Sequence, residues 1–259
     1  MPWTFAHPAA VLPLRRQFPD PRLLAALIAG ALVPDLAYYL GGLLGPVDAG
    51  RWGRWAHAPG GWLLVDTPLG GLMAGLFLAG RSWIAAPLPQ PWRGGLQALP
   101  GLRDADLRCL AQLLPASAAG AATHLLWDGF THAPGFFVQH LAWLRTELGL
   151  LDGRPWQLFN VLQHLSTLVG LAVLWRMLAA WRRRLGPPEA DGAEPAAERL
   201  RRAALLGLLA IAGVLGALLA RPDGGWQGEL HAWVVRSVVL ATGLAALGYA
   251  LLAVWWRAR

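Results

Sequence analysis

The chain alternates long apolar stretches with short connections that carry most of its charged residues. A helix that crosses a bilayer needs roughly 20 mainly apolar residues. Stretches of that kind lie at about residues 23–44, 61–82, 109–131, 158–180, 203–220 and 231–256. The pattern predicts an all-α, polytopic membrane protein of about six transmembrane helices. A short N-terminal half-helix, over residues 7–18, is expected to pack against them.

Composition supports a bilayer location. Of the 259 residues, 56% are hydrophobic and 14% are charged, whereas charged residues make up about 25% of ordinary soluble domains. The net charge of +7 would suit a nucleic-acid-binding protein, but the arginines sit mostly at the edges of apolar runs. We therefore expect membrane lipid around the chain and no nucleic acid. The single cysteine, Cys109, excludes a disulfide framework.

Arginine placement predicts the orientation and the domains. Positive residues that flank short loops are retained in the cytoplasm, which predicts a multi-pass protein of the inner (plasma) membrane with a cytoplasmic C-terminus. Residues 181–202 are rich in Pro, Gly, Ala and charge and predict a cytoplasmic linker. The linker would separate a four-span domain, residues 1–180, from a two-span hairpin, residues 203–259.

Ionisable side chains within the predicted spans gather in the outer half of the membrane. Charged groups in a bilayer are costly and usually mark functional sites. At 1.5 Å per residue, Asp35 lies about 20 Å and His124 about 22 Å from the cytoplasmic ends of their helices. His124 and Asp128 are four residues apart and share one helix face, and His132 is a further turn along.

The N-terminal segment and the first outer loop contribute further ligands at this depth. If residues 7–18 are helical, His7 lies about 18 Å above the turn that follows them. Pro34 removes a backbone donor and predicts a kink in the first span beside Asp35. The residues predicted to converge, on an outward-facing site, are His7, Asp35, His57, Asp66, His124, Asp128, His132 and His164.

Imidazole and carboxylate groups without a thiolate suit a divalent metal, namely zinc, with manganese or iron as alternatives. The set is larger than one tetrahedral zinc requires, so a two-metal centre fits as well. A bound cation lowers the pKa of its water toward about 7, and Asp66 or Asp128 could accept the second proton. Arg145 and Arg154, in an outer loop, could bind a phosphate or carboxylate. Hydrolysis of a phosphoester or a lipid-linked envelope substrate is the chemistry expected.

Two other classes stay open on the sequence alone. A polar cluster inside a membrane also suits an ion- or proton-coupled transporter. It can equally fix helix packing in a structural protein without catalysis. His164 has two readings as well, as a metal ligand or as a residue that hydrogen-bonds to one.

Several motifs together resemble the bacterial family called domain of unknown function 4184. They are the opening Met1–Leu14, Val33–Pro34–Asp35, Asp66–Gly70, Thr123–His132 and Val161–His164. The resemblance covers roughly the first 180 residues, and the family name carries no activity.

A more distant similarity is to inner-membrane metal-dependent hydrolases and to zinc-dependent phospholipase C. These proteins have an N-terminal His, an Asp after a helix, a mid-chain His and a His-x-x-x-Asp helix. Carried over residue by residue, the likeness implies metal ligation by His7, Asp35, His57, His124 and Asp128, with His132 as a further ligand.

Overall fold

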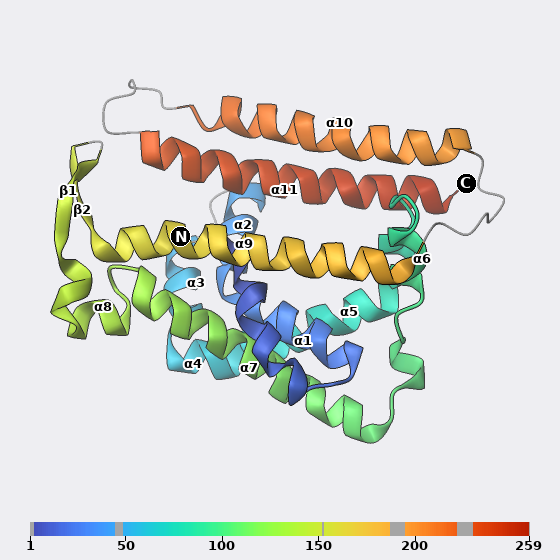
Figure 1. Cartoon of the computed structure of the whole chain (residues 1–259), viewed down its shortest axis with the longest axis horizontal. Helices are drawn as coiled ribbons and strands as arrows, with labels where there is room; N and C mark the ends of the chain where they lie inside the picture. Colours follow the sequence, from blue (N-terminus) through green and yellow to red (C-terminus); the bar gives the residue numbers. More distant parts are fainter. Residues whose placement is uncertain (1–2, 45–48, 152, 187–194, 222–229, 259) are drawn as a thin grey trace.

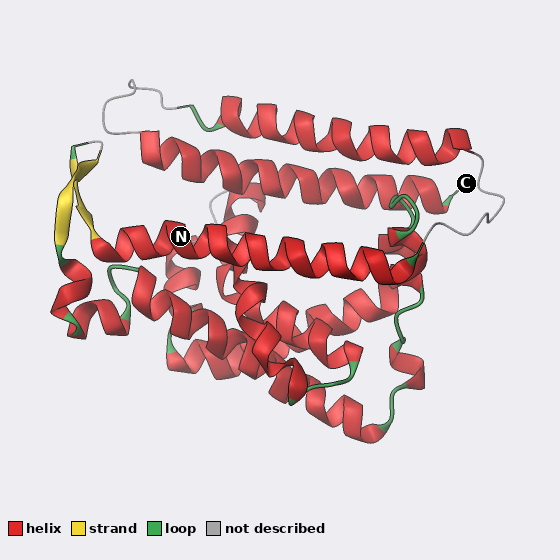
Figure 2. Cartoon of the chain, viewed as in Figure 1, coloured by secondary structure: helices red, strands yellow, loops and turns green. Residues whose placement is uncertain are grey.

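The computed structural model describes residues 3–44, 49–151, 153–186, 195–221 and 230–258. It is a bundle of long helices with a two-stranded β-hairpin at one end (Figures 1 and 2). In the described chain, six helical segments are long and apolar enough to cross a membrane: Pro21–Leu40, Pro59–Ala85, Leu107–His140, Leu158–Leu185, Pro195–Leu219 and Ala232–Arg257. The prediction of an all-α, polytopic membrane protein is confirmed.

The helices in chain order are η1 (Thr4–Arg16), α1 (Pro21–Leu32), η2 (Val33–Asp35), α2 (Leu36–Leu44), α3 (Ala49–Ala56), α4 (Pro59–Gly61), η3 (Trp62–Asp66), α5 (Thr67–Ala85), α6 (Trp92–Gln97), η4 (Leu102–Asp104), α7 (Leu107–Thr131), α8 (Phe136–His140), η5 (Ala142–Arg145), α9 (Leu158–Leu185), α10 (Pro195–Leu219) and α11 (Leu230–Arg257). The strands are β1 (Glu147–Leu151) and β2 (Arg154–Gln157).

Helices α1 and α7 form the centre of the bundle because small residues let their backbones approach. A side chain on Gly30 would overlap the backbone carbonyl of Ser117, and one on Gly120 would overlap the carbonyl of Leu27. Close helix contacts of this type are the main source of packing energy where lipid replaces water. The buried core beside this crossing includes Leu27 and, from the N-terminal segment, Val11.

Aspartate caps fix the beginning of both central helices. Asp20 accepts a hydrogen bond from Arg22 N at 2.8 Å, and Asp106 accepts one from Cys109 N at 2.7 Å. Such caps satisfy backbone donors that the first helical turn leaves unpaired. The Arg22 side chain then joins the two ends, since its Nε donates to Gly101 O at 2.9 Å.

The N-terminal segment is helical, as predicted, but with tighter geometry. It forms the 3₁₀-helix η1 over Thr4–Arg16 instead of an α-helix over residues 7–18. Pro8 and Pro13 lie inside it, and a proline removes one backbone donor and clashes with the preceding turn of an α-helix. The segment packs against α1, α7 and α9, and this contact buries His7.

Two spans are irregular at the level of the predicted site. The first is broken by the 3₁₀ turn Val33–Asp35, which confirms the irregularity predicted at Pro34. The second contains a π-helical turn, Trp62–Asp66, directly before α5. π-Helical turns are rare and occur frequently at functional sites. Both irregular turns end in a buried aspartate, Asp35 and Asp66.

The β-hairpin between α7 and α9 was not predicted. Strand β1 pairs antiparallel with β2, with Gly149 opposite Trp156 and Leu151 opposite Arg154. Gly149 and Gly153 have φ angles of 135° and 73°, a region in which glycine avoids the strain that other residues meet. The apolar side chains of Leu148, Leu150 and Leu151 are all exposed, so no buried face marks this short sheet in the sequence.

The C-terminal helices α10 and α11 pair with each other, and α11 packs against α2 and α5 of the N-terminal part (Figure 1). Tyr249 Oη donates to Ile84 O at 2.5 Å, and Arg93 Nη1 lies 2.7 Å from Glu198 Oε1. Helix α9 extends to Leu185 and α10 begins at Pro195. Both helices therefore enter the range 181–202 predicted as a linker, whose residues 187–194 lie outside the described chain. The division into 1–180, 181–202 and 203–259 stays a prediction.

Candidate metal centre

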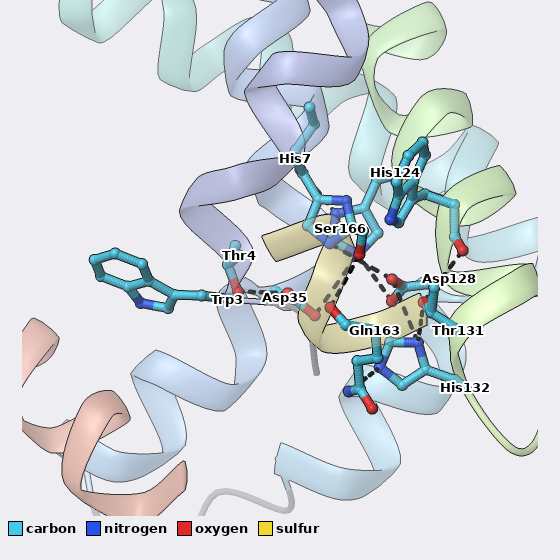
Figure 3. Close-up of polar contacts among 12 residues, drawn as sticks. Trp3, Thr4, His7, Asp35, His124, Asp128, Thr131, His132, Gln163 and Ser166 are labelled. Atoms are coloured by element: carbon cyan, nitrogen blue, oxygen red, sulfur yellow. Dashed lines mark hydrogen bonds and ion pairs between the residues drawn. The ribbon is translucent and has the colours of Figure 1, made fainter. Parts of the chain in front are cut away.

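Four side chains from three separate segments meet between η2, α3 and α7. Asp35 ends η2, His57 follows α3, and His124 and Asp128 lie one turn apart on α7. One ligand atom from each lies within 4.8 Å of every other. Figure 3 shows Asp35, His124 and Asp128 directed toward one another. Two imidazoles and two carboxylates form a ligand set that suits a divalent cation.

The distances match the spacing around one cation. His57 Nε2 and His124 Nε2 each lie 3.3 Å from Asp128 Oδ2. The same two nitrogens lie 3.8 and 3.7 Å from Asp35 Oδ1. Tetrahedral zinc with bonds of about 2.0–2.2 Å keeps neighbouring ligand atoms roughly 3.4 Å apart. The four distances between imidazole nitrogens and carboxylate oxygens are thus close to those that zinc requires.

Backbone carbonyls orient both imidazoles. His124 Nδ1 lies 2.8 Å from Ala31 O, and His57 Nδ1 lies 2.8 Å from Gly53 O. A carbonyl accepts but cannot donate, so Nδ1 must carry the proton in each ring. In the neutral form of each ring, Nε2 then keeps its lone pair and faces the carboxylates. Ligating histidines usually make this second hydrogen bond, which fixes the ring and its tautomer.

A chain of hydroxyl groups holds Asp35. Thr4 Oγ1 donates to Asp35 Oδ2 at 2.5 Å, and Tyr39 Oη donates to Thr4 Oγ1 at 3.0 Å. Oδ2 is therefore occupied, whereas Oδ1 faces the two imidazoles. The side chains of Thr4 and Asp35 are both buried. This chain links η1 to the broken first span.

Several polar atoms at the centre are buried without a hydrogen-bond partner among the described residues. They are His7 Nε2, Asp35 Oδ1, His124 Nε2 and Asp128 Oδ1. Leaving a buried polar atom unpaired costs about 1–3 kcal/mol, and more for a charged group. A cation bound between these atoms would remove that cost.

The second oxygen of Asp128 faces two further histidines. His7 Nε2 lies 3.5 Å and His132 Nδ1 3.3 Å from Asp128 Oδ1. The rings of His7 and His124 stack with centroids 3.8 Å apart. Asp128 therefore contacts imidazoles through both oxygens, and Figure 3 shows His7, His124 and His132 around it.

Electrostatics favour positive charge between the two carboxylates, while at least one of the neighbouring imidazoles is neutral. Burial and the neighbouring His124 lower the pKa of His7 to about 3, so this ring is neutral near pH 7. Burial also opposes the charged form of His57, but the hydrogen bond to Asp128 and the charge of Asp35 leave its pKa raised. Two carboxylates thus favour positive charge at the position between them.

Asp66 is buried beside this cluster. It is fully inaccessible, and neither of its carboxylate oxygens has a hydrogen-bond partner in the described chain. Its π-helical turn packs against α7 and η2, the elements that carry His124 and Asp35. Thr67, the next residue, donates instead to Trp62 O at 2.9 Å. The carboxylate of Asp66 is therefore held in the interior without a hydrogen-bond partner among the described residues.

His164, predicted as a ligand or as a residue that hydrogen-bonds to one, is not among the described residues that the structure brings together at the cluster. His164 lies on an exposed part of α9, where its ring stacks on Trp156 at 5.3 Å. Gln163 is buried instead, and its Nε2 lies 3.5 Å from His132 Nε2. Successive residues of a helix are rotated by about 100°, so only one of the two neighbours can face α7.

The two arginines predicted to bind substrate are not part of the cluster as described. Arg145 ends η5 and is exposed. Arg154 begins β2, but its side chain lies outside the described part of the structure. Their role in substrate binding stays a prediction.

Sequence reasoning missed the polar residues that support the ligands. Thr4 and Tyr39 hold Asp35, and Gln163 contacts His132. Thr4 lies one helical turn before His7, and this spacing could have marked it. Gln163 and Tyr39 carry no comparable signal, because polar residues near the outer ends of spans are common.

Replacing Thr4 with valine should weaken metal binding. Valine keeps the volume but loses the hydroxyl that holds Asp35, and loss of such a supporting hydrogen bond typically costs about 10- to 100-fold in metal affinity. Thr4→Ser, which keeps the hydroxyl, should bind zinc as the unmodified protein does. Zinc competition against a chromogenic chelator measures both. Equal affinity for Thr4→Val and the unmodified protein would contradict this account of Asp35.

Comparisons with known proteins show which family the chain belongs to, but they give no activity. Neither the curated proteins nor the solved structures give a match. The family model described as "Domain of unknown function (DUF4184)" matches residues 1–255. The match therefore extends well beyond the first 180 residues expected from the motifs and includes the C-terminal hairpin. The chain belongs to the DUF4184 family.

Proposed function

We propose that this protein is a membrane-embedded, metal-dependent hydrolase that acts on a phosphoester. Its active site is the cluster around Asp128. One observation carries the proposal: ligand atoms from η2, the residue after α3, and α7 converge at cation spacing, and several of them are buried without a hydrogen-bond partner among the residues that the structure describes. A purely structural cluster would pair these atoms with each other or with the backbone.

The ligand set favours zinc, with manganese and iron as alternatives. Asp35, His57, His124 and Asp128 supply two nitrogens and two oxygens, a mixture that all three metals accept. When bound there, the cation supplies Lewis acidity that activates water and polarises a phosphoryl oxygen. The protein's part is to hold the four ligands apart from bulk water and in fixed orientation.

The geometry also supports a second cation position. Asp128 Oδ2 faces His57 and His124, whereas Oδ1 faces His7 and His132. A carboxylate that offers one oxygen to each of two cations is a common bridge in two-metal hydrolytic sites. His7 Nε2, which has no hydrogen-bond partner in the described chain, would be a ligand at that second position.

Asp66 is the better of the two carboxylates predicted to move a proton. Both oxygens of Asp128 face imidazoles, so this side chain is best assigned as a ligand. Asp66 is buried, has no hydrogen-bond partner in the described chain and belongs to a turn packed on η2 and α7. We assign it the role of general base for the attacking water.

The location of the site supports a substrate in the membrane. The arginine distribution predicts that the site lies on the outer side of the inner membrane and the C-terminus in the cytoplasm. Substrates that reach this level include lipids and lipid-linked envelope precursors. Arg145, exposed in the segment after α8, would meet the anionic group of such a substrate.

Removal of His124 should abolish both metal binding and hydrolysis. Its Nε2 contacts both carboxylates, so His124→Gln should lower zinc content and should reduce hydrolysis of bis(p-nitrophenyl) phosphate at least about 100-fold. His140→Gln is the matched control, because His140 is exposed at the end of α8 and its Nδ1 contacts only Phe136 O among the hydrogen bonds described. Mass spectrometry of bound metal and a chromogenic assay provide the two readings.

Three results would count against the proposal. The unmodified protein could contain no metal while His124→Gln folds normally, which would favour a structural cluster. Hydrolysis could be equal in the two variants. Cation or proton flux into liposomes that Asp35→Asn abolishes, without any hydrolysis, would favour transport.

Substitution of Asp66 should separate proton transfer from metal binding. Asp66→Asn keeps the shape but removes the basic carboxylate, and loss of a general base typically costs about 10²- to 10⁴-fold in rate. Metal content should stay at the level of the unmodified protein. A variant that loses metal together with activity would show that Asp66 is a ligand, and one that keeps full activity would remove it from the mechanism.

A further inference from the structure

An apolar groove lies against the candidate metal centre, between η1, α7 and α9. Its volume is about 400 Å³, which is within the range of roughly 300–1,000 Å³ typical of ligand sites. The walls include Ala9, Ala10, Leu126, Trp127, Val169 and Val173. Small side chains on η1 thus create the hollow, and larger apolar side chains on α7 and α9 form its sides.

Apart from His7 and Trp127, the groove offers few side chains that could form hydrogen bonds with a ligand. Thr123 and Ser166 are in its wall, but Thr123 Oγ1 donates to Gly120 O at 2.7 Å and Ser166 Oγ donates to Gln163 O at 2.9 Å. Both donors are used within their own helices. A sugar or peptide, whose polar groups need partners, would bind poorly in such a groove.

At its polar end the groove is lined by His7, which contacts the metal cluster. His7 is part of the groove wall, and its Nε2 lies 3.5 Å from Asp128 Oδ1. Trp127, also in the wall, precedes Asp128 on α7. An apolar ligand in the groove would therefore present its terminal group to the imidazoles and carboxylates.

The groove is open toward the surrounding bilayer and continues along the same helices. Leu126 and Val169 are 57% and 54% exposed. Because both belong to membrane-spanning helices, their exposed sides face lipid. A second hollow of about 320 Å³ shares Trp127, Ser166 and Val169 with the groove and continues between α7 and α9. A hydrocarbon chain could enter sideways from the lipid without passing through water.

We propose that this groove binds the hydrocarbon chain of the substrate, so that the substrate is a membrane lipid with a hydrolysable phosphoester headgroup. The inference rests on the proposed function, since the headgroup must reach the cluster through His7. It deepens that function by naming the substrate class and the face from which it enters. Chain length and saturation would then govern binding, and a soluble phosphodiester would bind only to the polar end.

A photoreactive lipid tests the groove directly. The probe is phosphatidylglycerol with a diazirine at the middle of one acyl chain, incorporated with the full-length protein in nanodiscs, and the adducts are mapped by peptide mass spectrometry. Adducts are expected on η1, on α7 around Leu126 and on α9 around Val173. Val169→Phe should reduce them at least about fivefold, because the larger ring fills space that the chain needs.

Leu168→Phe is the matched control. Leu168 precedes Val169 on α9 and is 67% exposed, but it is not in the groove wall. This variant should keep the adduct pattern of the unmodified protein. Zinc content and the thermal unfolding midpoint, measured for both variants, verify that each one folds.

The outcomes separate the groove from the proposed function. Adducts that Val169→Phe removes and Leu168→Phe retains support the groove, even if the His124 experiment shows no metal-dependent hydrolysis. Adducts spread evenly over the lipid-facing helices, or reduced equally by both variants, would overturn it, even if hydrolysis depends on metal. A Val169→Phe protein that folds and keeps all adducts would overturn it as well.

Discussion

The contact between the Asp128 carboxylate and the imidazoles around it is the constraint on which the rest of the structure depends. Four histidine nitrogens lie 3.3–3.5 Å from its two oxygens, and its side chain is buried in a membrane-spanning helix. An isolated carboxylate at that depth is costly. The charge becomes favourable only where positive charge and oriented nitrogens surround it, so the fold must deliver ligands from several segments to this one level.

Irregular helical turns bring the ligands to this level. A straight first span would carry Asp35 on a continuous α-helix, but the 3₁₀ turn at Pro34 ends in the aspartate that Thr4 then holds. The π-helical turn before α5 likewise ends in Asp66. The proline-containing η1 brings His7 alongside His124. Departures from ideal helix geometry, which cost stability elsewhere, thus coincide with the residues proposed to bind metal or transfer a proton. The apolar groove ends beside the same residues.

Much of this arrangement follows from residue spacing along the sequence. Apolar length predicts the six spans, Pro34 predicts the break, and the four-residue interval from His124 to Asp128 predicts a shared face. The remainder depends on tertiary contacts. Whether Gln163 or His164 faces α7 is decided by helix rotation, which the sequence of α9 does not specify because the two polar residues are adjacent. The β-hairpin lacks an alternating buried face, and the ends of α9 and α10 lie in polar sequence that resembles a linker.

The most direct test of the account is an anomalous difference map from crystals of the zinc-supplemented protein, with data on both sides of the zinc absorption edge. The account predicts a peak bounded by Asp35, His57, His124 and Asp128, at bond distances of about 2.0–2.2 Å. A map without a peak at this position, in crystals where these four side chains are ordered, would contradict the central claim that the cluster exists to bind a cation.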